Sequence, residues 1–311
     1  MSSAHSRNLI LMLPQLPTQY RGLAYMLAGT FFFSAKAVLV KLAYQYPIDA
    51  VTLLTLRMGM ALPFYLIIGI FVFRTKLPTP LRWADHFNVI AFGFAGYYLA
   101  SLFDLMGLQY ISAGLERLIL YLYPTIVLLL SMVLFKRKIG RVEWTALLVA
   151  YIGVLIVYAK DAAILGAQGP LGVVLIFLCA VTFAIYVVGS GYMIPRMGAM
   201  RFTVYAMSVA CVAIIIHFFL TRPLASLNVQ VELLVISAII AVFCTVLPTF
   251  LMAWGIKLLG APRAALVGTV GPMLTILLAY FILGEEFTWV HAVGMLMVVI
   301  AVSFIGRQKP A

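Results

Sequence analysis

The sequence predicts an all-α, polytopic membrane protein whose ten transmembrane helices form two inverted five-helix repeats. Hydrophobic residues make up 65% of the chain and charged residues 10%, against roughly 45 to 50% and about 25% in a soluble globular protein. The apolar residues gather in runs of about 20, the length with which a helix crosses the hydrocarbon core. A run centred on Pro124 recurs 148 residues later around Pro272 without a gap, which indicates duplication.

The first repeat is predicted at residues 22–159. The segment before it has one short apolar stretch closed by Pro14, which is too short for a signal peptide, so we expect a loose cytoplasmic arm. The five apolar runs of this repeat are separated by short segments rich in Lys and Arg, and their ends are uncertain by a few residues. They predict helices at 22–43, 50–73, 86–107, 113–135 and 142–159.

The second repeat is predicted at residues 170–306, after a join near Gly166 to Pro170. Its apolar runs predict helices at 170–192, 202–220, 232–256, 262–283 and 287–306. The cysteines, Cys179, Cys211 and Cys244, lie in three different runs without a CxxC pair. We expect them to pack as small buried residues.

The loop charges predict the orientation of the helices. With a cytoplasmic N-terminus, the cytoplasmic segments hold 15 Lys and Arg residues and the outer loops hold 2, which places both termini inside a multi-pass protein of the inner membrane. An odd number of helices per repeat inverts the second one. The turn at Lys136 then faces the cytoplasm, whereas the equivalent acidic turn at Gly284 faces outside.

The net charge of +12 could suggest a nucleic-acid partner. The basic residues fall between apolar runs and form no patch on a folded, water-exposed face. The sequence therefore predicts the lipid bilayer and a small-molecule substrate as partners, with no nucleic acid, and leaves the oligomeric state open.

Four sequence features lie at defined positions within the two repeats. They are an Arg early in the second helix (Thr52-Leu-Leu-Thr-Leu-Arg57-Met), the stretch Gly107-Leu-Gln-Tyr-Ile-Ser-Ala-Gly114 leading into the fourth helix, a proline in mid-helix, and the Gly284-Glu285-Glu286 turn before the last helix. Over residues 22–306 this set resembles the drug/metabolite transporter superfamily, EamA type. The resemblance implies inward-open and outward-open exchange of small solutes across a bacterial cytoplasmic membrane, with the two repeats lining a central cavity. The first repeat departs from the pattern, because Lys136-Arg137 replaces the Gly-Glu turn and Met58 replaces an aromatic residue.

Ionisable residues at membrane depth are costly, and they usually face one another or an interior cavity. With a rise of about 1.5 Å per residue, Lys36 lies roughly 4 Å outside the midplane, Arg57 about 7 Å, Asp104 about 10 Å, and Glu116 with Arg117 about 12 Å. Their formal charges sum to +1. For Lys36 we weigh a substrate-facing ammonium against a side chain that snorkels outward, and its depth favours the first.

Arg57 has two interpretations. Its planar fork suits a carboxylate or phosphate, or it is paired permanently with Asp104 or Glu116, and the structural pairing is slightly favoured. Asp104 and Glu116 are the carboxylates that could carry a coupling proton within the bilayer. Because Glu116 and Arg117 are adjacent, they point about 100° apart on a helix, so we expect them near the lipid headgroups.

Aromatic side chains near the middle of the helices could stack on an amphipathic solute or hold a cation. Most are expected to be core residues. The candidates for substrate contact are Tyr97, Tyr121, Tyr186 and Trp254. The histidines His86, His217 and His291 lie near helix ends and are interpreted as interfacial.

Pro124 and Pro272 are candidate hinges. A proline inside a helix removes one backbone hydrogen bond and crowds the carbonyl four residues earlier. Transporters built from inverted repeats tend to bind their substrate at broken or bent helices near the midplane. A static kink that improves packing is the alternative. Small residues around Pro272, namely Ala261, Ala264, Ala265, Gly268 and Gly271, are expected to permit close helix packing.

The sequence therefore predicts a solute carrier that moves a small metabolite by alternating access. The substrate is an amino acid, an organic anion or another amphipathic compound, and an exporter of cationic drugs is an alternative. An intramembrane enzyme is a further alternative, but no HExxH or GxSxG run is present. A non-transporting membrane scaffold is the last. No catalytic residue, cofactor or metal is predicted, and no GxxxxGK[ST] run for nucleotide exists.

Overall fold

The computed structural model describes residues 18–74, 80–136, 140–259, 267–268 and 270–307. In this part of the chain, eight helical segments are long and apolar enough to cross a membrane. Two shorter apolar helices, Gly271–Leu283 and Trp289–Phe304, follow them. The prediction of an all-α, multi-pass membrane protein is confirmed.

The helices of the two predicted repeats follow one another with short connections. The first half contains α1 (Thr18–Ala43), α2 (Ala50–Phe73), α3 (Trp83–Gly93), the π-helical turn η1 (Phe94–Leu99), α4 (Ala100–Leu108), α5 (Ala113–Leu120), α6 (Tyr123–Phe135) and α7 (Arg141–Leu165). The second half contains α8 (Gly169–Met197), α9 (Ala199–Thr221), the 3-10 turn η2 (Leu224–Leu227), α10 (Val231–Ala241), η3 (Val242–Val246), α11 (Leu247–Leu259), α13 (Gly271–Leu278), η4 (Ala279–Leu283) and α14 (Trp289–Arg307).

Polar side chains fix the beginnings of two helices in the first half. Asp49 precedes α2 and accepts hydrogen bonds from the N–H groups of Val51 and Thr52. Ser112 precedes α5 and accepts one from the N–H of Leu115. These side chains satisfy donors that have no partner inside the helix, and they set the positions at which both helices begin.

Two spans that we predicted as unbroken helices contain a π turn in their interior, and a third π turn, η4, ends the helix that begins at Gly271. The span Trp83–Leu108 includes η1, and the span Val231–Leu259 includes η3. The turns begin at Phe94 and Val242, which are 148 residues apart. The backbone adopts a left-handed conformation at Lys136 (φ 53°) and at Gly284 (φ 67°), again 148 residues apart. The sequence repeat is therefore accompanied by a repeat in local backbone geometry.

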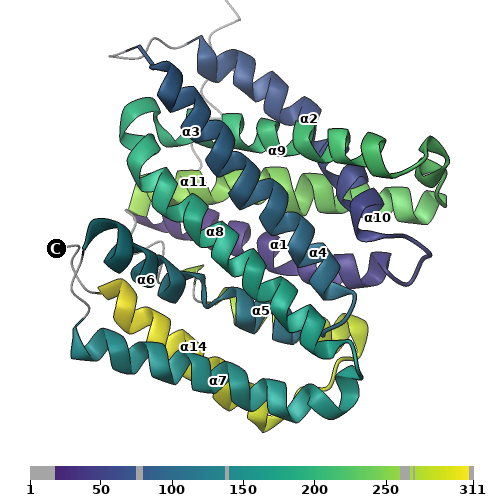
Figure 1. Cartoon of the computed structure of the whole chain (residues 1–311), viewed down its shortest axis with the longest axis vertical. Coiled ribbons are helices and arrows are strands. Elements are labelled where there is room, and N and C mark those ends of the chain that lie inside the picture. Colours follow the sequence, from purple (N-terminus) through teal and green to yellow (C-terminus); the bar gives the residue numbers. More distant parts are fainter. Residues whose placement is uncertain (1–17, 75–79, 137–139, 260–266, 269, 308–311) are drawn as a thin grey trace, which may run out of the picture.

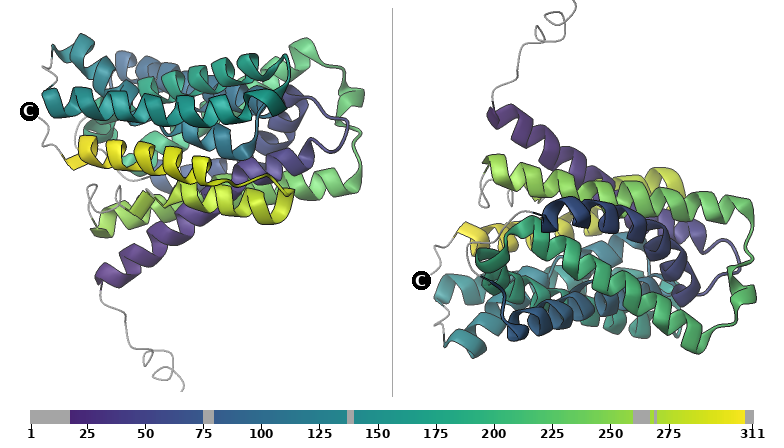
Figure 2. Two further views of the ribbon diagram at one scale, coloured as in Figure 1. Left: turned by 90° about the horizontal axis from the view of Figure 1, so that it is seen from below. Right: turned by 90° about the horizontal axis from the view of Figure 1, so that it is seen from above.

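The helices pack in pairs drawn from both halves of the chain. Helix α7 lies along α14 at the lower edge of Figure 1, α2 packs on α9, α1 on α11, and α4 on α8. In Figure 2 the first turns of α1 project beyond the rest of the bundle. Glycines permit a close crossing of α7 and α14, where a methyl group at Gly153 would come 2.8 Å from the carbonyl oxygen of Gly294.

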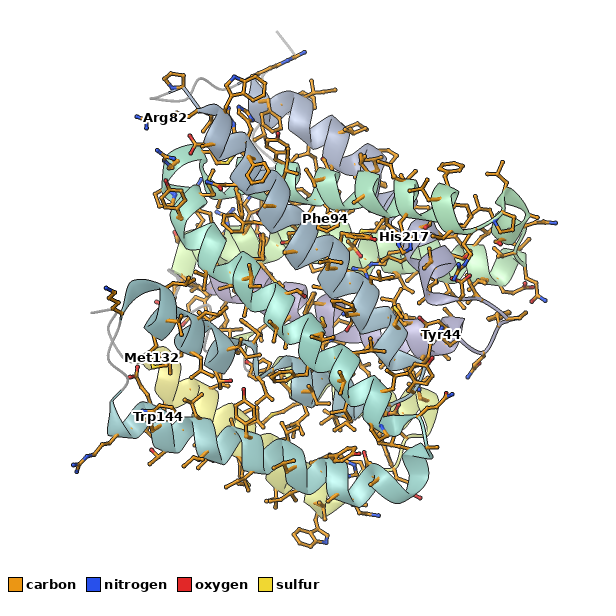
Figure 3. The ribbon with its side chains drawn as sticks, in the orientation of Figure 1. Tyr44, Arg82, Phe94, Met132, Trp144 and His217 are labelled. Carbon is orange, nitrogen blue, oxygen red and sulfur yellow. The ribbon has the colours of Figure 1, made fainter. Side chains whose placement is uncertain are left out.

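The buried apolar residues form two large clusters and one small one. The largest is built mainly from α1, α2, α4, α9 and α10, and the second lies mainly among α5, α7, α8 and α14. Cys179, Cys211 and Cys244 are buried and free, as predicted. Figure 3 shows Arg82 and Trp144 toward one end of the bundle and Tyr44 toward the other.

Candidate functional site

A buried ion pair joins α1 to α4. The ammonium of Lys36 lies 2.6 Å from Oδ2 of Asp104, and both side chains are almost fully enclosed. Lys36 therefore does not snorkel outward. Its apolar stem and its charge both lie inside the protein, where the contact with Asp104 offsets part of the cost of removing the two charges from water.

Glu116 and Arg117 on α5 extend this pair into a cluster. Oε1 of Glu116 lies 3.9 Å from the Lys36 ammonium, and Oε2 lies 3.7 Å from Nε of Arg117. The residues are 0% and 3% exposed, so their side chains face the interior of the protein and not the lipid, and their depth in the membrane stays a prediction. Although their Cα–Cβ directions diverge, the long Arg117 side chain returns to its neighbour inside the bundle.

The ring of Phe33 on α1 lies beside both cations of the cluster. Its centroid is 5.6 Å from the Lys36 ammonium and 5.1 Å from the Arg117 guanidinium. Nη2 of Arg117 also donates to the carbonyl oxygen of Phe33, at 3.4 Å. Cation–π contacts gain strength when the groups are desolvated, and Phe33 thus supports both basic residues from one side.

Arg57 on α2 stands apart from this cluster. Its Nε donates to Oγ1 of Thr245 in η3 at 2.9 Å, and Thr245 donates in turn to the carbonyl oxygen of Ile240. Among the described residues, no carboxylate oxygen lies within 4.0 Å of the Arg57 nitrogens. The direct ion pair with Asp104 or Glu116 that we slightly favoured is absent from these contacts.

Two of the four candidate aromatics meet each other. The hydroxyl groups of Tyr97 in η1 and Tyr186 on α8 are 3.1 Å apart, and their ring centroids are 4.7 Å apart. A π turn is a frequent feature of functional sites. Tyr97 and Thr245 occupy the same position in η1 and η3, counted from the start of each turn.

The other two candidate aromatics lie elsewhere. Tyr121 stands edge-on to Tyr123 at the end of α5. Trp254 on α11 is 47% exposed and contacts Tyr25. The structure therefore brings Tyr97 and Tyr186 together. The rings of Tyr123 and Phe183 connect Tyr121 to this pair, whereas Trp254 has separate surroundings.

The predicted proline kinks are helix breaks. α5 ends at Leu120, α6 begins at Tyr123, and Pro124 occupies the first turn of α6. Pro272 likewise occupies the first turn of α13. A proline in the first turn sacrifices no intrahelical hydrogen bond, so neither residue kinks a continuous helix. Ala261, Ala264 and Ala265 lie outside the described residues.

Hydroxyl groups link α1 to α13 beside the second break. Ser34 donates to the carbonyl oxygen of Gly271 at 3.0 Å, and Thr275 donates to the carbonyl oxygen of Ser34 at 3.1 Å. We did not predict roles for Ser34, Thr245 or Thr275. The sequence feature that could have identified them is a hydroxyl side chain within an apolar run, because such groups form hydrogen bonds between membrane helices.

Three polar contacts join the helix ends on the side of Tyr44. Glu285 accepts hydrogen bonds from the N–H groups of Ala113 and Gly114 at the start of α5. Arg222 lies 3.2 Å from Asp49, at the meeting of α9 with α2. The third contact joins His291 to Asp161 at 3.0 Å.

Hydrogen bonds reach both ring nitrogens of His291. The N–H of Thr288 donates to Nδ1 of His291, so Nε2 carries the proton that is donated to Oδ1 of Asp161. His291 is buried between α14 and α7 near the ends of both helices, and its interfacial depth stays a prediction. His217 pairs with the hydroxyl of Tyr98 at 2.9 Å.

Two contacts join the opposite helix ends. Arg196 at the end of α8 forms an ion pair with Asp85 in the first turn of α3. Arg201 at the start of α9 donates to the carbonyl oxygen of Val72 near the end of α2. Within the described part of the chain, no three His, Cys, Asp or Glu side chains come close enough together to hold a metal ion.

Comparisons with known proteins agree with this architecture. The model of the EamA-like transporter family matches residues 20–159 and 170–307. The uncharacterized transporter YcbK of Bacillus subtilis is 29% identical over 88% of each chain. A second one, YyaM of the same organism, is 26% identical over 79% of this chain and 81% of its own. A solved crystal structure aligns with a TM-score of 0.60 over 91% of this chain and 95% of that chain. Its 16% identity restricts that likeness to the fold.

Proposed function

Because this chain belongs to the EamA-like transporter family, we propose that it is a secondary transporter that moves a small metabolite across the cell membrane by alternating access. The observation that carries the proposal is the set of five buried ionisable side chains within apolar helices, namely Lys36, Arg57, Asp104, Glu116 and Arg117. Such residues are costly at membrane depth and typical of transport pathways. A scaffold that only packs helices has no need of them.

We further infer that the two halves, residues 22–159 and 170–306, are inverted repeats of five helices each. The matched π turns and left-handed positions support this inference. So do the helix crossings, because Gly22 of α1 packs on Leu259 of α11 as Gly172 of α8 packs on Ile111 after α4. Leu259 and Ile111 are themselves 148 residues apart.

Alternating access then consists of a change in the contacts between the two repeats. Glu285, Arg222 and His291 tie helix ends together across the repeats on the outer side. Opening of that side requires these contacts to break, and the breaks before Pro124 and Pro272 are the positions at which α5–α6 and α13 can bend. Helix breaks near the midplane serve this role in transporters with inverted repeats.

The substrate is proposed to contact residues of both repeats. Lys36, Asp104 and Arg57 supply charge, and the paired Tyr97 and Tyr186 supply aromatic surface. Tyr121, at the break after α5, and Trp254, on α11, remain candidates. An amino acid, an organic anion or an amphipathic compound suits this combination. The net charge of +1 within the buried set disfavours a cationic drug.

The proposed orientation places both termini in the cytoplasm, in the inner membrane of a bacterium. The excess of Lys and Arg in the segments assigned to that side supports it. Tags at the two ends should both resist modification by membrane-impermeant reagents in intact cells. Reaction of the C-terminal tag alone would contradict the inverted five-helix arrangement.

The transport proposal is tested with purified protein in sealed vesicles. Uptake of labelled amino acids, organic acids and quaternary ammonium compounds is compared with that of protein-free vesicles. We expect saturable uptake of at least one of the first two classes, and strong impairment by Lys36→Ala at normal protein level. A correctly inserted protein that moves no member of the three classes would contradict the proposal.

A further inference from the structure

Arg57 is buried with its hydrogen-bonding capacity only partly used. The residue is 6% exposed. Its Nε donates to a neutral hydroxyl, that of Thr245, and its Nη1 has no hydrogen-bond partner although the atom is shielded from solvent. A buried guanidinium is ordinarily paired with a carboxylate or with several acceptors. Thr245 therefore holds the Arg57 guanidinium by a hydrogen bond, but no carboxylate of the described residues contacts it.

The charges around it leave Arg57 as the uncompensated member of the buried set. Lys36 has Asp104 at 2.6 Å, and Arg117 has Glu116 at 3.7 Å. These four charges cancel formally. Arg57 adds the remaining +1, and a lone charge at this depth is far more costly than a paired one.

The surroundings of Arg57 hold the guanidinium in place without neutralising it. Thr245 is fixed by its bond to Ile240 across the π turn η3, and Tyr65 of α2 places its hydroxyl 3.5 Å from the carbonyl oxygen of Thr245 and 3.4 Å from the hydroxyl of Thr249. An arginine that is oriented in advance by neutral groups retains its charge for a ligand.

We infer that Arg57 receives the carboxylate group of the transported solute through its free Nη1. This inference rests on the proposed transport function and specifies its substrate class as carboxylates. A carboxylate supplies one negative charge, which matches the single uncompensated positive charge. A phosphate monoester carries about −1.5 to −2 at neutral pH and would overcompensate it.

The test uses four acids and their primary amides, namely propionate, lactate, alanine and phenylalanine. Binding is measured as the shift in thermal unfolding midpoint of the purified protein. We expect at least one acid to raise the midpoint while its amide does not, because the amide lacks the charge. Arg57→Gln should lower the affinity for the acid, measured from the concentration that raises the midpoint, by at least about tenfold. Arg57→Lys should restore part of that affinity.

Arg74→Gln is the matched control, because Arg74 follows the same helix and is exposed. It should retain the full acid response. Without ligand, the midpoint of Arg57→Gln should equal or exceed that of the wild type, since the substitution removes an uncompensated buried charge. This second readout excludes misfolding as the cause of a lost response.

Three results would overturn the assignment. They are an unchanged acid response in Arg57→Gln, equal responses to acid and amide, and no response to any acid. Uptake by vesicles separates this inference from the transport proposal. If the protein carries only amides or cations across the membrane, transport stands and the role of Arg57 is wrong.

Discussion

The ammonium of Lys36 and the carboxylate of Asp104 lie 2.6 Å apart in the interior of the bundle. They come from α1 and α4, and Asp104 Oδ1 has no hydrogen-bond partner. Each residue is therefore the nearest counter-charge of the other. Loss of Asp104 leaves a buried ammonium that Glu116, at 3.9 Å, compensates only weakly. Loss of Lys36 leaves the buried Asp104 carboxylate without the cation that it contacts.

Lys36→Met should lower the free energy of unfolding by about 3–5 kcal/mol, because it leaves Asp104 unpaired. The double variant Lys36→Met, Asp104→Leu should recover most of that loss, because no unpaired carboxylate remains. Both variants should lose transport. Unfolding curves in detergent measure the first effect, and a single variant as stable as the wild type would show that the pair carries little energy.

Glu285→Ala should destabilise the protein by about 0.5–2 kcal/mol, the usual cost of losing a helix cap. The substitution removes the acceptor for the N–H groups of Ala113 and Gly114 and a negative charge at the positive end of α5. Glu286→Ala is the control, since its side chain is exposed next to Glu285. Equal unfolding midpoints for the two variants would argue against the capping contact.

Gly294→Ala should cost about 1–3 kcal/mol through overpacking of α14 on α7. The added methyl group would lie 2.4 Å from Val157 and 2.7 Å from the carbonyl oxygen of Gly153. Gly191→Ala on α8 meets nothing within 4 Å, and it should be neutral or stabilising by up to about 1 kcal/mol. Thermal unfolding of the two variants side by side tests the close crossing.

The pKa of Asp49 provides a prediction for acid stability. Partial burial raises this pKa, but hydrogen bonds from Thr52 and Val51 together with the charge of Arg222 lower it more, so the folded-state pKa lies below the ordinary 3.8. The charged form thus stabilises the folded protein above the ordinary value, and this contribution is lost as the pH falls through the folded-state pKa.

Asp49→Asn should therefore be less stable than the wild type at neutral pH and should converge with it in acid. Unfolding midpoints recorded between about pH 6 and pH 3 test this behaviour. The difference should be small, because both Asp49 and Arg222 are partly exposed and solvent screens them. A difference that grows as the pH falls would have the wrong sign.

The sequence predicted best those features that are encoded over many residues. Long apolar runs predicted the helices. The 148-residue offset between Pro124 and Pro272 predicted a duplication, and the π turns that begin at Phe94 and Val242 have the same offset. Lys36 and Asp104 could be predicted as interior residues because ionisable groups at membrane depth usually face one another or a cavity. These inferences depend on composition and period, which need no knowledge of side-chain contacts.

The wrong predictions concern the direction in which a side chain points and the residue that it contacts. Adjacent residues on a helix diverge by about 100°, which led us to separate Glu116 from Arg117, yet the length of the arginine side chain brings its Nε within 3.7 Å of the carboxylate. We predicted a kink at Pro124 and not a helix break, because the residues at the break, Tyr121 and Leu122, include no glycine and no polar residue that would indicate a helix end. The pairing of Arg57 with Thr245 joins residues 188 positions apart, and periodicity carries no information at that range.

Counterflow in sealed vesicles tests alternating access most directly. Vesicles are loaded with an unlabelled solute that the protein carries, then diluted into a trace of the same solute with a label. The account predicts a transient accumulation of label above its equilibrium level, because a carrier that opens to one side at a time exchanges inner for outer solute. Entry of label that rises to equilibrium without an overshoot, at equal rates in loaded and empty vesicles, would contradict it.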